Sequence, residues 1–338
     1  MSRDALTDVL RTVRLRSAVY FYVSGSGAWA AEAPPSKDIA SAVLPGAEHV
    51  IEYHVVTSGE CWATVDGESP RKLGRGDVVL LTQGDAHIIS SAPGVRGKLF
   101  LDAYFNLDRD RRPFRMHYAN SADPTAVVDE KAAAVPEDTA AASIICGFIG
   151  LDARPFNPLI ATLPRLLHLP AVRAGDSSGH LARMAAIESA SARPGSEAVL
   201  ERLGEAMFVD AIRRHIDAMP ESAAGWLAGL RDPYVGRALA LLHERPAAAW
   251  TIDQLGSRVG LSRSALHQRF VDLIGQPPIQ YLANWRMQLA SRLLVDTRAS
   301  VASIALDVGY ESEAAFVRAF KRLAGKPPGT WRRERGPA

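Results

Sequence analysis

The sequence predicts an α+β protein of more than one domain, with a β-rich N-terminal part, a helical middle and an all-α C-terminal domain. Three observations support this prediction. Short apolar runs separated by turn residues extend to about Phe105, the apolar period becomes helical after Pro158, and a helix–turn–helix pattern occurs twice near the C-terminus. A chain of 338 residues fits two domains and a linking module, because domains commonly contain about 100–200 residues.

The N-terminal part is typical of a series of short strands. Its apolar runs are rich in Val, Ile, Tyr, Phe and Thr, and turn pairs such as Ser58-Gly59 and Asp66-Gly67 separate them. These runs cover residues 20–23, 50–57, 61–65, 78–82 and 98–105. Residues 106–135 predict a connection with an edge strand, and the apolar run 143–151 predicts one more buried strand. Short strands spaced about 8–12 residues apart indicate a sandwich or a barrel.

The chain after Pro158 shows a helical period. A first helical face collects Leu159, Leu163, Leu166 and Leu167, and further helices are expected around residues 181–187 and 199–216. This layer either carries dimer contacts or packs on the β-rich part, and the sequence leaves both open. The predicted boundaries are 1–155 for the β-rich domain, 156–229 for a helical linker or dimerisation region, and 230–335 for the C-terminal domain.

An internal repeat near the C-terminus is the most informative feature of the sequence. The first half of the motif recurs after 49 residues, where Leu255, Val259 and Gly260 correspond to Ile304, Val308 and Gly309. The second half recurs after 50 residues, where Leu266, Phe270, Leu273, Gly275 and Pro277-Pro278 correspond to Phe316, Phe320, Leu323, Gly325 and Pro327-Pro328. The turn of the second copy is therefore one residue longer.

Capping residues place the helix ends within each copy. Thr251 and Gln254 have capping-box spacing, which predicts a helix from Ile252 onward. Ser262 and Ser312 are the expected N-caps of the second helices. Glycines suited to a left-handed C-terminal conformation mark the expected helix ends, at Gly260, Gly275 and Gly325. Residues 279–295 predict a linking helix between the two copies.

The second helix of each copy predicts a DNA-reading surface, because the second helix of a helix-turn-helix enters the major groove. The residues expected to point outward are Ser264, His267, Gln268 and Val271 in the first copy, and Ala314, Val317, Arg318 and Lys321 in the second. Gln268 and Arg318 are equivalent, and their side chains suit adenine and guanine respectively. The flanking residues Arg263, Arg269 and Arg322 are expected to contact phosphates. A plain helical hairpin is the alternative for one copy, but two matching copies favour DNA binding.

Charge is distributed unevenly along the chain. Residues 231–338 contain 16 Lys and Arg against nine Asp and Glu, a net charge of +7, whereas the preceding residues have 23 against 28, a net charge of −5. A basic C-terminal third favours a polyanion as partner, and a solvated basic tail is the alternative.

Cysteine content and hydropathy bear on the compartment. The two cysteines, Cys61 and Cys146, do not form a disulfide framework and fit a reducing cytoplasm. The polar N-terminus predicts no secretory signal, and no apolar run reaches the ~18 residues that span a bilayer. We therefore expect a cytoplasmic protein with no membrane partner.

The C-terminal repeat resembles the AraC/XylS family of bacterial transcription regulators over residues 233–331. The matching motifs are Ala265-Leu-His-Gln-Arg-Phe270, Gly275-Gln-Pro-Pro278, Trp285-Arg-Met287, Val308-Gly-Tyr310, Glu313-Ala-Ala-Phe316 and Gly325-Lys-Pro-Pro328. The resemblance implies two recognition helices that enter successive major-groove segments of promoter DNA. One departure is Gly256, where the family usually has Ala. Gly inside a helix costs ~1 kcal/mol relative to Ala, so a looser first copy is expected.

The β-rich part resembles a cupin barrel. Residues 76–87, from Gly76 to His87, follow the second cupin motif with Thr82 at the usual Pro position, and residues 54–67 weakly match the first motif. The metal-binding cupin pattern would have His at the position of Glu52, two residues before His54, so the ligand set is incomplete. The soft metal-ligand candidates are His54, Cys61, His87 and Cys146.

An effector pocket inside the barrel is preferred to a metal site, since small barrels can enclose one ligand. The aromatic residues that either line such a pocket or belong to the core are Tyr20, Tyr22, Trp62 and Tyr104. We therefore expect a regulator rather than an enzyme, without a cofactor, that binds promoter DNA and a small-molecule effector. A homodimer, and RNA polymerase as partner of an activator, are further expectations. The alternative is a cupin-type metalloenzyme fused to a DNA-binding module, which stoichiometric bound Fe or Mn would favour.

Overall fold

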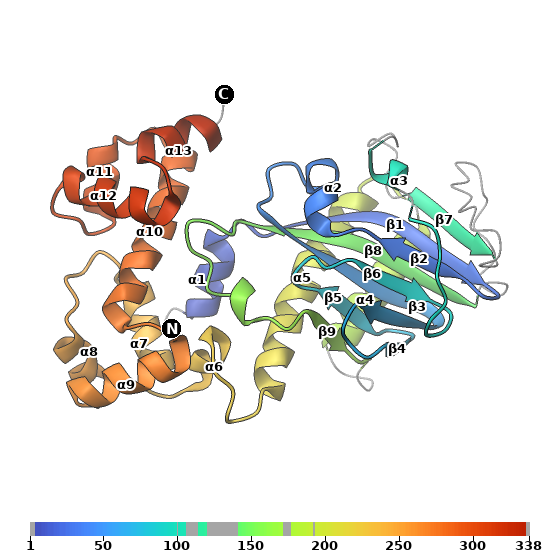
Figure 1. The fold of residues 1–338 in the computed structure, drawn as a ribbon, viewed down its shortest axis with the longest axis horizontal. Helices are drawn as coiled ribbons and strands as arrows, with labels where there is room; N and C mark the ends of the chain where they lie inside the picture. The colour runs from blue at the N-terminus through green and yellow to red at the C-terminus, as the bar shows by residue number, and fades with distance from the viewer. Residues whose placement is uncertain are drawn as a thin grey trace. The chain divides into compact units, whose positions relative to one another are not determined.

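The computed structural model describes residues 4–99, 101–105, 114–119, 141–171, 177–191 and 193–335. The chain divides into two compact units (Figure 1). The first contains residues 1–14, 152–162 and 218–338, and the second contains residues 15–151 and 163–217. This division differs from the predicted boundaries. The N-terminal residues and the segment 152–162 group with the C-terminal helices, and residues 163–217 group with the sheet.

The second unit is built on a curled sheet, which has nine strands within the described residues. The strands are β1 (Arg16–Ser26), β2 (Ala30–Ala33), β3 (His49–Val65), β4 (Arg71–Gly74), β5 (Val78–Leu81), β6 (His87–Ser90), β7 (Phe114–Ala119), β8 (Ala142–Leu151) and β9 (Leu166–Leu169). The main order is β2-β6-β3-β8-β1-β7, while β4 and β5 also pair with β3, and β9 pairs with β5. All pairs are antiparallel except β1 with β7. A cupin-like fold is thus confirmed.

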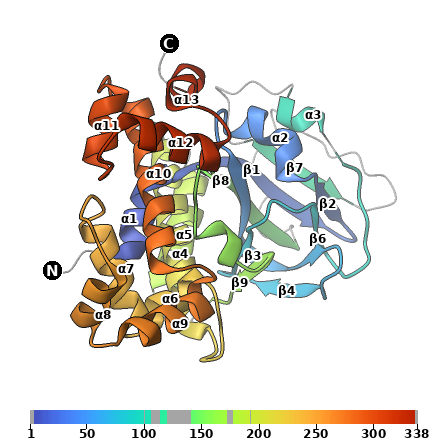
Figure 2. The ribbon, with the colours of Figure 1, turned by 60° about the vertical axis from the view of Figure 1, so that its left-hand side comes forward.

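The two faces of the sheet have different neighbours. Helices α2 (Ser36–Val43), α3 (Asp102–Phe105), α4 (Ser177–Ser191) and α5 (Ser196–Ala218) complete the second unit. In Figure 2 α4 and α5 run along one face of the sheet. A Cβ at Gly204 of α5 would lie 2.2 Å from Ser17 Oγ and 2.9 Å from Tyr53 Oη, so glycine allows α5 to approach the sheet closely. Because side chains alternate along β3, its residues Glu52 and His54 point to the opposite face from Tyr53.

Three expectations for this unit are wrong. The leucines expected on a helix, Leu166 and Leu167, lie in β9, which pairs with β5. The described residues of the segment 98–105 form no strand: Leu99 makes one isolated bridge and residues 102–105 are helical. Ser58-Gly59 does not separate two strands, because β3 continues through it with a register shift against β8. The expected edge strand is β7, and the rest of residues 106–135 lies outside the described residues.

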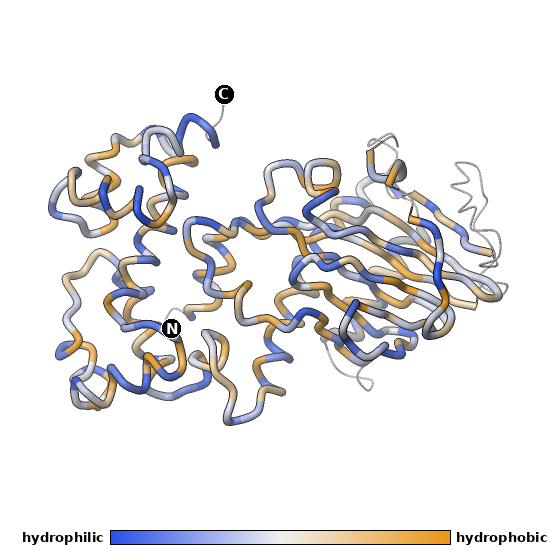
Figure 3. The backbone as a smooth tube through the Cα atoms, in the orientation of Figure 1, coloured by the Kyte–Doolittle hydropathy of each residue, from blue (hydrophilic) through white to orange (hydrophobic). Residues whose placement is uncertain are grey.

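The first unit is helical among its described residues. Its helices are α1 (Ala5–Thr12), α6 (Trp226–Arg231), α7 (Val235–Glu244), α8 (Ile252–Val259), α9 (Arg263–Ile274), α10 (Pro278–Asp296), α11 (Val301–Asp307), α12 (Glu313–Ala324) and α13 (Pro328–Arg335), with a 3₁₀ turn at Ile160–Thr162. Figure 3 shows apolar stretches along the sheet strands and a hydrophilic α13. The predicted linking helix is α10, and the two helix-turn-helix copies are α8–α9 and α11–α12.

The predicted helix ends of the repeat are confirmed. Thr251 and Gln254 form both hydrogen bonds of a capping box at the start of α8. The Ser262 and Ser312 hydroxyls accept the backbone N–H of Ala265 and Ala315 at 3.3 Å. The three terminating glycines are left-handed, with φ of 84° at Gly260 and 78° at Gly275 and Gly325.

Candidate nucleic-acid interface and interior site

Helices α9 and α12 bury one side and expose the other, in the phase that the sequence predicts. Their buried aromatic and leucine side chains are Leu266, Phe270, Phe316 and Phe320, each 0% exposed. The predicted outward residues Ser264, His267, Gln268, Ala314, Arg318 and Lys321 are exposed, and Val271 and Val317 are half-buried. Two equivalent helical surfaces are therefore free of the core. The contact of these residues with DNA stays a prediction.

The cations of α9 are neutralised within the protein. Arg269 Nε donates to Asp232 Oδ2 at 2.8 Å, and its guanidinium lies 5.4 Å from the Tyr234 ring centroid. Burial alone would raise the pKa of Asp232, but hydrogen bonds from Arg269 and two backbone amides hold that pKa below its usual value. Arg263 Nη1 lies 3.2 Å from Asp253 Oδ2. The two arginines expected to contact phosphates in the first copy are thus already paired with carboxylates.

The cations of α12 are not neutralised in this way. Arg318, Lys321 and Arg322 are exposed, and none of them forms an ion pair with another residue in the described part of the chain. Lys321 and Arg322 lie in the last turn of α12. In contrast to α9, the surface of α12 therefore presents free positive charge.

The sequence interpretation missed a basic aromatic hollow beside α8. The guanidinium carbons of Arg245 and Arg258 lie 5.8 Å and 5.9 Å from the Trp250 ring centroid, and both arginines are exposed. Asp253 and Ser257 also line this hollow. The two arginines could have been noted from charge alone, but only the fold brings them onto one indole ring.

Arg286 of α10 connects the two copies. Its guanidinium donates to the carbonyls of Pro246 at 2.7 Å and Ala248 at 2.8 Å, which precede α8, and to Gly309 at 3.1 Å, in the turn of the second copy. Burial lowers the pKa of Arg286 from its usual value. A single side chain therefore links the linking helix to both helix-turn-helix copies.

Gly256 does not act as the resemblance led us to expect. A Cβ at this position would lie 2.7 Å from the carbonyl oxygen of Leu261, a backbone atom that cannot move away easily. The equivalent residue of the second copy is Ala305, which is fully buried and precedes a turn one residue longer. The shorter first turn therefore needs Gly256, and the expectation of a residue that merely loosens the helix is wrong.

The sheet of the second unit encloses a small interior cavity of about 40 Å³. Apolar side chains from β1, β7 and β8 line most of it, among them Phe21, Met116 and Phe148. A water molecule needs about 10–15 Å³ on this measure, so the cavity holds only a few atoms in this conformation. Of the expected pocket aromatics, Tyr104 lines the cavity and Tyr22 and Trp62 do not. The side chain of Tyr20 lies outside the described residues.

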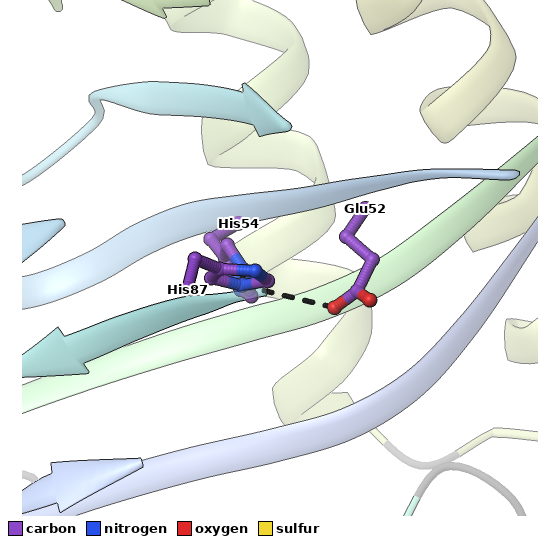
Figure 4. Close-up of side chains that lie close together, drawn as sticks. All are labelled: Glu52, His54 and His87. Carbon is purple, nitrogen blue, oxygen red and sulfur yellow. Dashed lines mark hydrogen bonds and ion pairs between the residues drawn. The ribbon is translucent and has the colours of Figure 1, made fainter. Parts of the chain in front are cut away.

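Three polar side chains of this lining, Glu52, His54 and His87, lie close together (Figure 4). Glu52 and His54 lie two residues apart on the same face of β3, and His87 begins β6. His54 Nε2 lies 2.7 Å from His87 Nε2, and His87 Nε2 lies 3.7 Å from Glu52 Oε2. Cys146, opposite His54 in the β3–β8 register, places Sγ 2.9 Å from His54 Nδ1. We call Glu52, His54 and His87 the interior cluster.

Burial disfavours charge on every member of the interior cluster. Burial raises the pKa of Glu52 to about 8, although a hydrogen bond from Ser36 opposes this, and burial lowers the pKa of His87 to about 4. Burial and the neighbouring His87 also lower the pKa of His54. Both shifts at the Glu52–His87 contact therefore favour the uncharged forms.

Hydrogen bonds assign the tautomers of the two histidines in this state. His87 Nδ1 donates to the carbonyl of Asp85 at 3.1 Å, so its Nε2 is an acceptor. Burial raises the pKa of Cys146, which keeps the thiol protonated as a donor to His54 Nδ1. His54 Nε2 then donates to His87 Nε2. Each hydrogen bond from Cys146 through His54 and His87 to the Asp85 carbonyl thus has one donor and one acceptor.

The structure brings together three of the four predicted soft ligands. His54, His87 and Cys146 line the cavity, whereas Cys61 does not. Glu52 was missed as a ligand, although its position two residues before His54 on a strand was a usable signal. Two imidazoles and one carboxylate form a donor set that zinc accepts in proteins. The residues present therefore fit a metal ion, despite the departure from the cupin pattern.

No helix among the described residues combines the length and the apolar character needed to cross a membrane.

Comparisons with known proteins find matches for both the sheet domain and the helix-turn-helix domain. A family model described as cupin matches residues 4–217, and one described as a helix-turn-helix domain matches residues 255–334. An AraC-like transcription regulator of Streptomyces lividans is 33% identical over 336 residues, which are 98% of this chain and 98% of that protein. The HTH-type transcriptional regulator AlkR of Acinetobacter baylyi is 26% identical over 98% of this chain and 99% of its own length. Among solved structures, the DNA-binding domain of AdpA in complex with a target DNA is 30% identical, with a TM-score of 0.29, over 30% of this chain and 92% of that one.

Proposed function

Since this chain belongs to the AraC-like transcription regulators and carries a cupin domain, we propose that it binds promoter DNA sequence-specifically through α9 and α12, under the control of a ligand in the cupin domain. One observation carries the DNA-binding proposal. Two copies of one motif, joined by α10, expose equivalent surfaces while their aromatic residues are fully buried. Two such helices suit two successive segments of the major groove.

The charges of the two copies indicate how each would contribute to affinity. Free cations on α12 suit phosphate contacts, whose formation releases counterions and makes binding depend on salt. On α9, Arg263 and Arg269 would have to leave their carboxylate partners before they contact phosphates. They would therefore add less to the affinity for DNA. Gln268 and Arg318 remain the residues best placed to read bases.

Selection of bound fragments from genomic DNA, followed by gel shifts of the full chain at several salt concentrations, tests this proposal. We expect enriched upstream fragments and a linear fall of log affinity with log salt concentration. Lys321→Ala should reduce the magnitude of the salt slope by about 1, whereas Arg269→Ala should change it less. No enrichment, or an affinity insensitive to salt, would refute DNA binding.

The path of the chain supports control by a ligand. β1 and β8 line the interior cavity through residues such as Phe21 and Cys146. Their neighbouring segments, residues 1–14 and 152–162, belong to the same compact unit as the DNA-binding helices. There Arg14 pairs with Asp296 at the end of α10, and Phe156 N–H donates to Gln288 Oε1 of α10 at 3.0 Å. A ligand that shifts β1 or β8 would therefore act on segments bound to the linking helix.

The expected homodimer is a further part of the proposal. Met184 and Ile187 of α4 and Val199 of α5 are 53%, 61% and 42% exposed, so these apolar side chains are available for a contact with a second copy. Sedimentation of the full chain tests this, and a monomer at all concentrations would contradict it. A contact with RNA polymerase is expected if the protein activates transcription.

A further inference from the structure

The interior cluster has its polar atoms arranged as a set of ligands. The nearest atoms of Glu52, His54 and His87 lie within 4.8 Å of one another. A tetrahedral zinc ion with bonds of about 2.0–2.1 Å holds its ligand atoms about 3.3 Å apart. The observed separations of 2.7 Å between the two Nε2 atoms and 3.7 Å between His87 Nε2 and Glu52 Oε2 lie on either side of that value. Side-chain adjustments of about half an ångström would bring these two separations to that value.

Each member of the interior cluster is held by a partner on its far side. His87 Nδ1 bonds the carbonyl of Asp85, His54 Nδ1 faces Cys146 Sγ, and Glu52 Oε1 accepts from Ser36 Oγ at 3.1 Å. Partners of this kind orient metal ligands, because they fix the ring tautomer and direct the free atom toward the ion. The remaining atoms are Nε2 of His54, Nε2 of His87 and Oε2 of Glu52, and they are directed at one another.

The members of the interior cluster are deeply buried. Glu52 is 2% exposed, His54 5% and His87 3%. A cation bound there would replace the contacts of Nε2, Nε2 and Oε2 with one another by bonds to one ion. The adjoining apolar cavity leaves a fourth position open for water or a small ligand.

We propose that Glu52, His54 and His87 bind one divalent transition-metal ion of the zinc type through Oε2, Nε2 and Nε2. In the bound state His54 carries its ring proton on Nδ1 and donates it to Cys146 Sγ, so Cys146 is a positioning residue. This inference deepens the proposed function, because it names the class of ligand that the cupin domain binds.

Metal analysis of the purified full chain tests the proposal. After chelation and dialysis, the protein should take up one Zn²⁺ per chain, and Co²⁺ in its place should give the visible absorption of a tetrahedral site. Glu52→Gln, His54→Ala and His87→Ala should abolish stoichiometric uptake. His49→Ala is the matched control, since His49 lies on the same strand but bonds the carbonyl of Thr82, away from the cluster. Cys146→Ala should keep the ion and weaken its binding by about 10–100-fold.

The outcomes separate this inference from the proposed function. Circular dichroism confirms that each variant folds, and Glu52→Gln, which keeps the shape of the side chain, decides the matter if the histidine variants do not fold. No uptake by the folded wild type, or equal uptake by Glu52→Gln and wild type, overturns the metal site. Gel shifts on the same samples report DNA binding separately: DNA binding without zinc refutes only the metal site, and zinc uptake without DNA binding refutes only the regulator.

Discussion

The two helix-turn-helix copies share their framework but differ in how their charges are balanced. Both begin their second helix with a serine N-cap and end it with a left-handed glycine, and both bury two aromatic or leucine side chains at equivalent positions. In the first copy Arg263 and Arg269 are paired with carboxylates, whereas Arg318 and Lys321 of the second copy form no ion pair with any residue that the structure describes. The repeated framework therefore sets where each helix lies, and the partners of the exposed side chains set how each could bind.

We expect this difference in charge pairing to give the two copies different roles in DNA binding. We expect α12 to make the stronger electrostatic contact with DNA, while α9 presents the neutral side chains of Ser264, His267 and Gln268. In the first copy Arg245 and Arg258 flank Trp250 beside α8, and neither forms an ion pair with another described residue. A phosphate contact of the first copy is therefore expected beside α8 rather than along α9.

The largest effect on stability is expected from removing the hydrogen bonds that join α10 to the two helix-turn-helix copies. Arg286→Met removes three hydrogen bonds from a charged donor to the carbonyls of Pro246, Ala248 and Gly309. Hydrogen bonds of charged groups contribute about 1.5–3 kcal/mol each and are not additive, so we expect a loss of about 3 kcal/mol. Hydrogen exchange of α8 and α11 in the full chain measures it. Arg298→Met, at an exposed residue after α10, is the control, and equal protection in both variants would contradict the role of Arg286.

The next effect concerns sequence discrimination. Arg318→Ala should reduce the preference for a selected site over random DNA by about 1–3 kcal/mol, the value of one bidentate base contact. Gln268→Ala should do the same at a different base pair of the site, because the two residues are equivalent. Arg322→Ala should weaken binding to both kinds of DNA alike. Competition gel shifts measure the ratio, and an equal loss of discrimination for Arg318→Ala and Arg322→Ala would refute the assignment.

The helical repeat was predictable because its signals are local. A capping box needs only Thr251 and Gln254, and a left-handed helix end needs only a glycine such as Gly260, so residues a few positions apart decide the outcome. The outward phase of α9 and α12 follows from helical periodicity alone. Charge pairing was not predictable in the same way, since Arg269 and its partner Asp232 are far apart in the sequence and meet only in the fold.

The sheet was less predictable because its partners are distant. Leu166 and Leu167 fit a helical period, but β9 forms because it pairs with β5 more than 80 residues earlier. Gly59 has the conformation of a turn residue, with φ of 70°, yet pairing with β8 keeps β3 continuous across it. For the interior cluster, the spacing of Glu52 and His54 on one strand was visible in the sequence. The register that sets Cys146 opposite His54 was not.

The smallest effect tests whether the short turn after α8 is the reason for glycine at Gly256. Gly256→Ala gains about 1 kcal/mol of helix propensity, but overpacking against the Leu261 carbonyl costs about 1–3 kcal/mol, so a net loss of about 1 kcal/mol is expected. Insertion of one residue after Leu261, which copies the longer second turn, should turn that loss into a gain. Ala305→Gly is the matched variant. The second copy has room for the alanine methyl group, so replacing it with glycine should only lower the helix propensity and destabilise α11 by about 1 kcal/mol. Hydrogen exchange of α8 and α11 measures each opening free energy. If Gly256→Ala stabilises α8 without the insertion, then the short turn does not require glycine, and the two copies differ in charge alone.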